Sequence, residues 1–164
     1  MRNGLAVHTF LLKRDVPHEM AHLPYPLRSV ESAPELLELP TQQVVIATPF
    51  RGAKTVVLAL APCGSAVDVR ALERAAGCRV KPVPADEIPE LTGYPTGFMP
   101  PVALTCDTKV VLDRSFEAQP VLYAGSGEAG LLLKIRPADL AAVAGAVLAD
   151  IARVIADAPS ADAR

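Results

Sequence analysis

Two short apolar runs, residues 43–49 and 55–61, constrain the fold of this chain more than any other feature. The residues between them, 50–54, include a glycine at the point where the chain must reverse direction. Apolar runs of strand length joined by a short glycine-containing segment are typical of a β-hairpin. The sequence therefore predicts a pair of antiparallel strands over these two runs.

Helices and strands are mixed along the rest of the chain without a regular βαβ order. Further strands are expected at residues 5–12, 79–84, 110–112, 120–123 and 131–135. Helices are expected at residues 32–37, 67–77, 86–91 and, from the spacing of apolar side chains, 137–155. This mixture predicts an α+β fold, in which helices pack on a mixed, curved β-sheet within a single domain over residues 1–164. Residues 159–164 are expected to fray.

Composition limits the classes of partner. Sixteen Lys and Arg side chains oppose 18 Asp and Glu, for a net charge of −2, so the chain is not expected to coat DNA or RNA by bulk attraction. A small local contact with nucleic acid stays open. No apolar run is long enough to cross a bilayer, and the N-terminus lacks a cleavage pattern of small residues. We therefore expect a soluble, cytoplasmic protein with no membrane partner.

Residue types that often bind metals occur here without the spacing of ligands. The cysteines are odd in number and widely separated, and each is expected to be a small buried hydrophobe: Cys63, Cys78 and Cys106. The histidines have no carboxylate or thiolate at ligand spacing: His8, His18 and His22. Three acidic residues stand at expected helix starts, where capping explains them: Asp68, Asp86 and Asp139. The sequence predicts neither a metal site nor a disulfide.

Residues 125–130 match the GxGxxG pattern of dinucleotide-binding loops. That function requires a helix to open at the end of the loop, so that its N-terminus meets the pyrophosphate. The segment that follows, 131–135, is expected to be a strand. We therefore expect no nucleotide cofactor, and we interpret the segment as a glycine loop between two strands, whose backbone amides can still line a ligand pocket.

Residues 92–101, TGYPTGFMPP, form a loop that is too apolar for an ordinary surface connection. Its prolines restrict the backbone and its glycines allow a ligand to approach closely. Two interpretations stay open: a stiff turn packed by Tyr94 and Phe98, and the wall of a preorganised pocket. The second is favoured by a family resemblance.

This loop resembles the TGY…GG…P loop of the YbaK/prolyl-tRNA synthetase-associated family of aminoacyl-tRNA editing domains, with matches at Thr92, Gly93, Tyr94, Gly97 and Pro101. Upstream, ESAPELLELPTQQVVIATPF is similar to a helix and the first hairpin strand of the family, and APCGSAVDVRALERAAG to a strand that leads into an aspartate-capped helix. Downstream, LYAGSGEAGLLLKIRPADL resembles the tyrosine, glycine loop, strand and proline-capped final helix. The resemblance is strongest over residues 30–155.

The resemblance implies the fold of the family's editing domain and hydrolysis of the ester that joins a wrong amino acid to tRNA. Such chemistry needs a placed water and hydrogen-bond donors directed at the developing oxyanion. The implied partner is the acceptor end of an aminoacyl-tRNA, with an aminoacyl-tRNA synthetase as a second candidate. The implied substrate-binding residues, expected to line one cleft, are Gly93, Tyr94, Gly97, Phe98, Met99, Pro101, Gly125, Ser126 and Gly127.

The chain departs from the family pattern at several positions. Ile46 stands where the hairpin strand of the family carries a lysine that holds the substrate end, and no other residue is assigned the catalytic role. Arg51 and Lys54 lie in the hairpin turn and are expected to point away from the site. Phe98 and Ala103 replace two glycines of the loop, and Phe98 is expected to narrow the pocket. The helix that precedes the first strand in the family is not expected here.

Three functions follow from these observations. The first is a free-standing deacylase that hydrolyses mischarged tRNA. The alternative is a catalytically weakened relative that binds an amino acid, a tRNA acceptor end or a synthetase without turnover. The third is an unrelated enzyme acting on a small molecule. Ile46 separates the first two, because a polar group that reaches the same point from elsewhere favours the enzyme and an apolar wall favours the binder.

Overall fold

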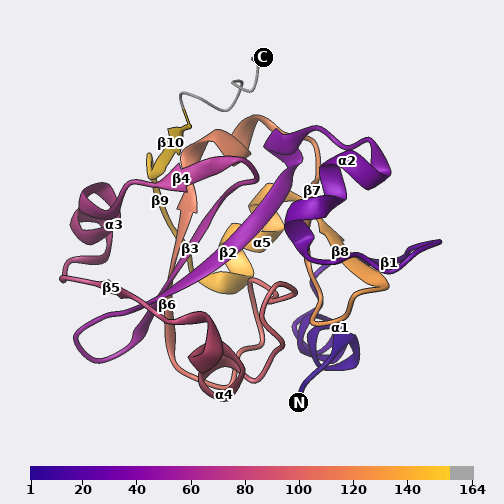
Figure 1. The fold of residues 1–164 in the computed structure, drawn as a ribbon, viewed down its shortest axis with the longest axis horizontal. Coiled ribbons are helices and arrows are strands. Elements are labelled where there is room, and N and C mark those ends of the chain that lie inside the picture. The colour runs from indigo at the N-terminus through magenta and orange to yellow at the C-terminus, as the bar shows by residue number, and fades with distance from the viewer. Residues whose placement is uncertain (156–164) are drawn as a thin grey trace.

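A computed structural model describes residues 1–155 of the chain, and its centre is one mixed β-sheet (Figure 1). The strands of this sheet lie in the order β1-β8-β7-β2-β3-β6-β9, and β5 pairs with the outer end of β2. Their bounds are β1 Glu19–His22, β2 Val44–Arg51, β3 Val56–Pro62, β5 Lys81–Pro82, β6 Thr108–Asp113, β7 Leu122–Gly125, β8 Leu131–Ile135 and β9 Val147–Ala149. A separate pair joins β4 Ser65–Val67 to β10 Ala152–Val154. The helices are α1 Gly4–Lys13, α2 Ala33–Leu37, α3 Val69–Ala76, α4 Ile88–Thr92 and α5 Pro137–Ala144.

The hairpin predicted from the two apolar runs is confirmed. Strands β2 and β3 are antiparallel, with Ile46 opposite Ala61 and Phe50 opposite Val57. On the outer sides of this hairpin, β2 runs parallel to β7 and β3 runs parallel to β6. The combination of parallel and antiparallel pairs with separate helices confirms the predicted α+β class.

Strand β3 lies in the interior because both of its faces are covered. Leu58 and Leu60 face a core that also contains the side chains of α1 and α5, whereas Val57 and Ala59 face a second core beneath α3. Alternate residues of a strand point to opposite faces of a sheet, so this continuous apolar run matches burial on both sides. Packing on both faces of β3 therefore fixes the position of the hairpin, and with it the position of β2.

The N-terminal segment is a helix and not the strand expected at residues 5–12. Asn3 caps α1 by accepting a hydrogen bond from the backbone N–H of Leu5 (3.1 Å). Val7 and Leu11 are spaced four residues apart and are fully buried against the sheet. The β-branched residues misled the prediction, because tertiary burial of one helical face outweighs local strand propensity. The helix expected to be missing before the first strand is present, and strand β1 follows it, where the sequence predicted no strand.

The C-terminal helix expected over residues 137–155 ends at Ala144. Gly145 adopts φ +60°, a left-handed conformation that glycine accepts and that stops a helix. The chain then turns back, and β9 joins the sheet parallel to β6. The buried carboxylate of Asp113 accepts hydrogen bonds from the backbone N–H groups of Ile151 (2.9 Å) and Ala152 (2.8 Å). Residues 159–164, which were expected to fray, lie outside the described residues.

Smaller expectations have mixed outcomes. The helix expected over residues 67–77 is α3, which Asp68 caps through Ala71 N–H (3.1 Å). Ser32 and Glu35 have the spacing of a capping box at the start of α2. The box does not form, since the Ser32 hydroxyl donates to the carbonyl of Ser29. Asp86 and Asp139 cap no helix through their side chains, and only 81–82 of the strand expected over residues 79–84 is present. Among residues 1–155, no helix has the length and apolar character needed to cross a membrane.

Candidate functional site

The central strand β2 has a gap in its outer edge. Strand β7 pairs with that edge at Val44 and Val45, and β5 pairs with it at Phe50 and Arg51. Among residues 1–155, no strand pairs with the outer edge of residues 46–49. A sheet edge without a neighbour presents backbone donors and acceptors that a ligand can use.

The register of the hairpin identifies which backbone groups face this gap. The carbonyl of Val44 accepts a hydrogen bond from Cys63 N–H (2.9 Å), and the N–H of Gly52 donates to the carbonyl of Thr55 (2.9 Å). The backbone N–H and C=O groups of the even-numbered residues of β2 therefore point toward β3. In an antiparallel pair, the residues between them point the other way. The N–H and carbonyl of Ala47 therefore face the gap. Pro49 has no N–H, and its carbonyl already accepts from Val83 (3.3 Å).

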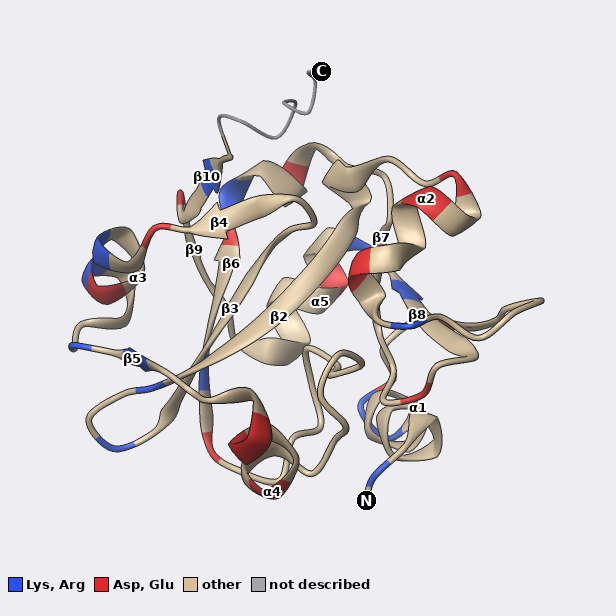
Figure 2. Ribbon diagram, viewed as in Figure 1, with Lys and Arg blue, Asp and Glu red and all other residues tan. Residues whose placement is uncertain are grey.

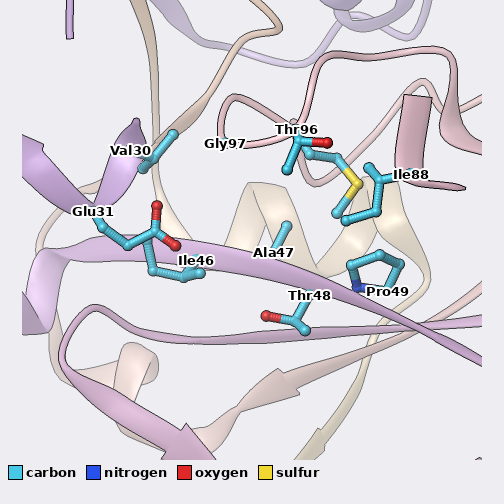
Figure 3. A pocket seen from close by; sticks show the side chains of 10 residues that line it. Val30, Glu31, Ile46, Ala47, Thr48, Pro49, Ile88, Thr96 and Gly97 are labelled. Atoms are coloured by element: carbon cyan, nitrogen blue, oxygen red, sulfur yellow. The ribbon is translucent and has the colours of Figure 1, made fainter. Parts of the chain in front are cut away.

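A pocket of about 380 Å³ lies against this gap (Figure 3). Strand β2 forms its floor, and the other walls come from α4, the 3₁₀ turn Val30–Ser32 and the loop after α4. Its lining is mostly apolar: Val30, Glu31, Ile46, Ala47, Thr48, Pro49, Ile88, Thr96, Gly97 and Met99. The Thr96 hydroxyl donates to the carbonyl of Ala85 (2.9 Å). The volume and the apolar walls fit a small organic group held by a few polar contacts.

Ile46, which the sequence analysis assigned to the position of the family lysine, lines this pocket. Its side chain, like that of Phe98, also packs against the buried cluster that contains Val30 and Val44. A polar group nevertheless reaches the same region from another element, because the Glu31 carboxylate and Ile46 lie at the same end of the pocket (Figure 3). The charge at this point is therefore the opposite of the charge that a lysine would bring.

The two glycine-containing loops named by the sequence lie directly against each other. The N–H of Gly127 donates to the carbonyl of Phe98 (2.7 Å). A Cβ atom on Gly125 would lie 2.5 Å from the carbonyl oxygen of Met99, so only glycine allows the loops to approach so closely. Of the nine residues that were expected to line one cleft, Gly97 and Met99 line the pocket.

Most of the other expected residues make structural contacts within or beside these two loops. Tyr94 is fully buried, and its hydroxyl donates to the carbonyl of Ala103 (2.8 Å). Ser126 is equally buried and donates to Leu131 (2.7 Å). Gly93 ends α4 at φ +87°, and Pro101 lies buried in the loop. Substrate binding by these residues stays a prediction, and their present contacts are within the protein.

Metal-binding residue types do not gather in the structure. Within residues 1–155, no three His, Cys, Asp or Glu side chains are close enough to hold an ion. His8 lies on α1 and not in a strand, and its Nδ1 is 2.8 Å from Nε2 of His18. The cysteines are free and partly exposed, not fully buried as expected. Burial, and then the charge of Glu31, raise the pKa of the Cys63 thiol. The glycine loop of residues 125–130 joins β7 to β8, so the expected strand follows it in place of the helix that a dinucleotide-binding loop requires.

Basic side chains gather along one side of the molecule, around α3, β5 and the β2–β3 turn (Figure 2). We call this group the basic edge; its members are exposed: Arg51, Lys54, Arg70, Arg74, Arg79, Lys81 and Lys109. Arg51 is opposite Lys81 in the sheet and bonds Glu87 (2.9 Å), and Lys109 donates to the C-terminal end of α3 at Ala76 (2.9 Å). The basic edge begins two residues beyond Pro49, about 7 Å from the pocket along β2.

Comparison with known proteins identifies the family. The model of the aminoacyl-tRNA editing domain matches residues 25–143. This chain belongs to the aminoacyl-tRNA editing domain family. The match confirms the resemblance drawn from the loop and hairpin residues.

Solved structures agree with this membership. The hypothetical protein APE2540 is 30% identical to this editing-domain chain with a TM-score of 0.84, and the match covers 90% of this chain and 99% of that one. A protein described as a "putative trans-editing enzyme for prolyl tRNA synthetase" is 26% identical with a TM-score of 0.82, over 92% of this chain and 96% of that one. A search of curated proteins found no match.

Sequence reasoning missed two groups in the pocket of this editing domain, Glu31 and the Ala47 backbone. Glu31 directly precedes Ser32 and Glu35, whose capping-box spacing accounts for the polar residues of this segment without a site. Pro49 was the available signal for the open edge, because a proline in a central strand is tolerated only where its missing N–H is not needed.

Proposed function

We propose that this editing domain hydrolyses the ester bond of a mischarged aminoacyl-tRNA, as a free-standing deacylase. The observation that carries the proposal is the open edge of β2, where the Ala47 N–H faces an apolar pocket. Family membership supplies the substrate class. The pocket supplies room for a small side chain and the ester group.

The chemistry requires little from side chains. Water attacks the ester carbonyl carbon, the carbonyl oxygen gains negative charge, and the bond to the ribose oxygen breaks as that oxygen takes a proton. A backbone N–H directed at the developing oxyanion contributes about 3 kcal/mol, or two to three decades in rate. An aminoacyl ester is already activated, so donor placement and orientation provide much of the necessary rate.

The basic edge supports tRNA as the partner. A net charge of −2 does not favour bulk RNA binding, but seven exposed cations on one side provide the small local contact that the sequence left open. An acceptor strand whose terminal ester enters the pocket extends along β2 toward these cations. Phosphates there would release counterions on binding, which makes the affinity depend on salt. A partner synthetase and a cytoplasmic location stay predictions.

The alternative, binding without turnover, is favoured by one observation: Ile46 replaces the lysine of the family with an apolar wall. Deacylation assays with tRNAs charged with small amino acids separate the two functions. We expect release of the amino acid above the spontaneous rate. Tight binding of the same aminoacyl-tRNAs without faster release would contradict the deacylase and establish the binder.

A further inference from the structure

One charged side chain lines the pocket, and it is an acid. Glu31 lies in the 3₁₀ turn Val30–Ser32, immediately before α2, and the other lining residues are apolar except Thr48 and Thr96. Figure 3 shows the Glu31 carboxylate at the Ile46 end of the pocket. Glu31 therefore determines the sign of the charge that a ligand meets there.

The main chain around Glu31 is fixed against the pocket. The N–H of Val30 donates to the carbonyl of Gly97 (2.9 Å), and the Cys63 thiol donates to the Glu31 carbonyl (3.5 Å). These contacts hold the turn between the loop after α4 and the end of β3. The fold therefore fixes the main chain from which the Glu31 side chain extends toward the pocket.

The carboxylate itself has no cationic partner in the described part of the chain. No Lys, Arg or His nitrogen of residues 1–155 lies within 4.0 Å of it, and no hydrogen bond to it is formed. Glu31 is exposed, and its neighbours in the pocket are mostly aliphatic, so the carboxylate is open to a ligand that enters there. Such a carboxylate is an effective acceptor for a cationic N–H group, because charge-assisted hydrogen bonds are about twice as strong as neutral ones.

We propose that Glu31 binds the α-ammonium group of the aminoacyl ester, an inference that rests on the proposed deacylase function. Every unmodified aminoacyl ester carries this ammonium next to the carbonyl that reacts. With the ammonium held by Glu31, the adjacent carbonyl lies over β2, where Ala47 offers its N–H. The aliphatic lining, including Ile46 and Ile88, receives the amino-acid side chain.

The same arrangement selects among substrates. A carboxylate in the side chain of the amino acid would meet Glu31 in the same small pocket, and like charges at short range repel. Aspartyl and glutamyl esters are therefore poor ligands, whereas small aliphatic esters carry the required cation and fit the apolar walls.

The test measures binding of two adenosine analogues in which the ester is replaced by a stable amide. One is 3′-alanylamino-adenosine, which carries the ammonium, and the other is its N-acetyl form, which does not. We expect the native protein to bind the first about tenfold more tightly. Glu31→Gln should abolish this preference by weakening only the cationic analogue, and Glu31→Asp should retain most of it. Glu35→Gln removes the same charge from exposed α2, outside the pocket lining, and should change nothing.

Several outcomes would overturn the inference. Equal affinity of the native protein for the two analogues would show that no contact to the ammonium is made. Equal loss of affinity for both analogues in Glu31→Gln would show that Glu31 has a structural role. With alanyl-tRNA as substrate, a lower kcat at unchanged KM in Glu31→Gln would assign Glu31 to the water instead. The amides are not hydrolysed, so their binding is measured independently of deacylation. A preference for the cationic analogue in a protein that does not deacylate tRNA would support this inference and contradict only the proposed function.

Discussion

Ile46 lies at the Glu31 end of the pocket, where a charged side chain at position 46 would change the charge that a ligand meets. A lysine there would direct an ammonium toward the acceptor-end phosphate or the ester carbonyl, and a charge-assisted hydrogen bond contributes about 1.5–3 kcal/mol. We expect Ile46→Lys to raise kcat for deacylation by about one to two decades. The introduced ammonium also meets Glu31, which reduces the cost of burying it and raises KM for cationic substrates.

Single-turnover deacylation, with thermal unfolding measured beside it, checks this prediction. Ile46→Met, which is unbranched and uncharged, is the matched control and should leave kcat unchanged. A folded Ile46→Lys protein with native kcat would show that another group already fills the role of the lysine.

Protonation of the Cys63 thiol contributes to the pH dependence of the free energy of unfolding. Burial, and then the charge of Glu31, raise the pKa of this thiol above its ordinary value of 9.0. The folded protein therefore keeps a proton that the unfolded chain releases, so the stabilising contribution is present below pH 9.0 and is lost as the pH rises through the folded-state pKa.

Urea unfolding between about pH 7 and pH 10 measures this effect. We expect the free energy of unfolding to fall over the alkaline part of this range, and to fall less steeply in Cys63→Ala. Burial also raises the pKa of Cys106 and of Tyr94, so part of the slope remains in the variant. Identical slopes for the two proteins would contradict the assignment to Cys63.

Among the elements, β2 offers a test that depends on which edge a residue faces. Ala47→Pro removes an N–H that points into the pocket, whereas Thr48→Pro removes one that bonds to β3. We expect Ala47→Pro to keep its stability to within about 1 kcal/mol and to lose two to three decades of deacylation. Thr48→Pro should lose about 1–3 kcal/mol of unfolding free energy.

Circular dichroism melts and deacylation rates measure the two effects separately. Ala47→Val keeps the N–H while adding bulk, and it should stay within about tenfold of the native rate. If Ala47→Pro hydrolyses the ester as fast as Ala47→Val does, the Ala47 N–H is not the oxyanion donor.

The sequence predicted elements well where one signal dominated. The hairpin of β2 and β3 has two clear apolar runs, and α3 has Asp68 at its start and Gly77 at its end. It failed where two signals competed: the apolar spacing of residues 137–155 continues past Gly145, although a left-handed glycine ends α5 there. Helix α1 carries strand-forming residues, and the burial of Val7 and Leu11 against the sheet outweighs their local preference.

The site was predictable to a similar extent. The loop after α4 was singled out by its glycines, prolines and aromatic residues, and position 46 by the family resemblance, and residues of both line the pocket. Pro49 is consistent with an unpaired edge of β2, but the extent of that edge could not be derived, because it depends on where β7 stops pairing and β5 starts. Those strands are distant in sequence, and their register is a property of the assembled sheet.

For the whole molecule, the basic edge predicts how tRNA binding depends on salt. Arg74→Gln combined with Arg79→Gln removes two exposed cations, and each lost phosphate contact reduces the slope of log affinity against log salt by about 0.7–0.9. We expect a higher KM for aminoacyl-tRNA and an unchanged kcat. Filter binding at several salt concentrations measures the slope.

A matched double variant, Lys13→Gln with Arg153→Gln, removes two exposed cations from α1 and β10, outside the basic edge. It should retain the native slope. If the salt-dependence slope falls by the same amount in both double variants, tRNA binding depends on net charge alone and not on a particular side of the molecule.

Strand β1 pairs with β8, so one end of the sheet is closed by segments from nearly opposite ends of the described chain. On a ribosome that adds about 5–20 residues per second, β1 emerges roughly ten seconds before β8 exists. The hairpin of β2 and β3 needs only neighbouring residues, and it can form in that interval. During synthesis, α1 and β1 are therefore exposed to chaperones and proteases. They become protected only when β8, one of the last strands to be synthesised, pairs with β1.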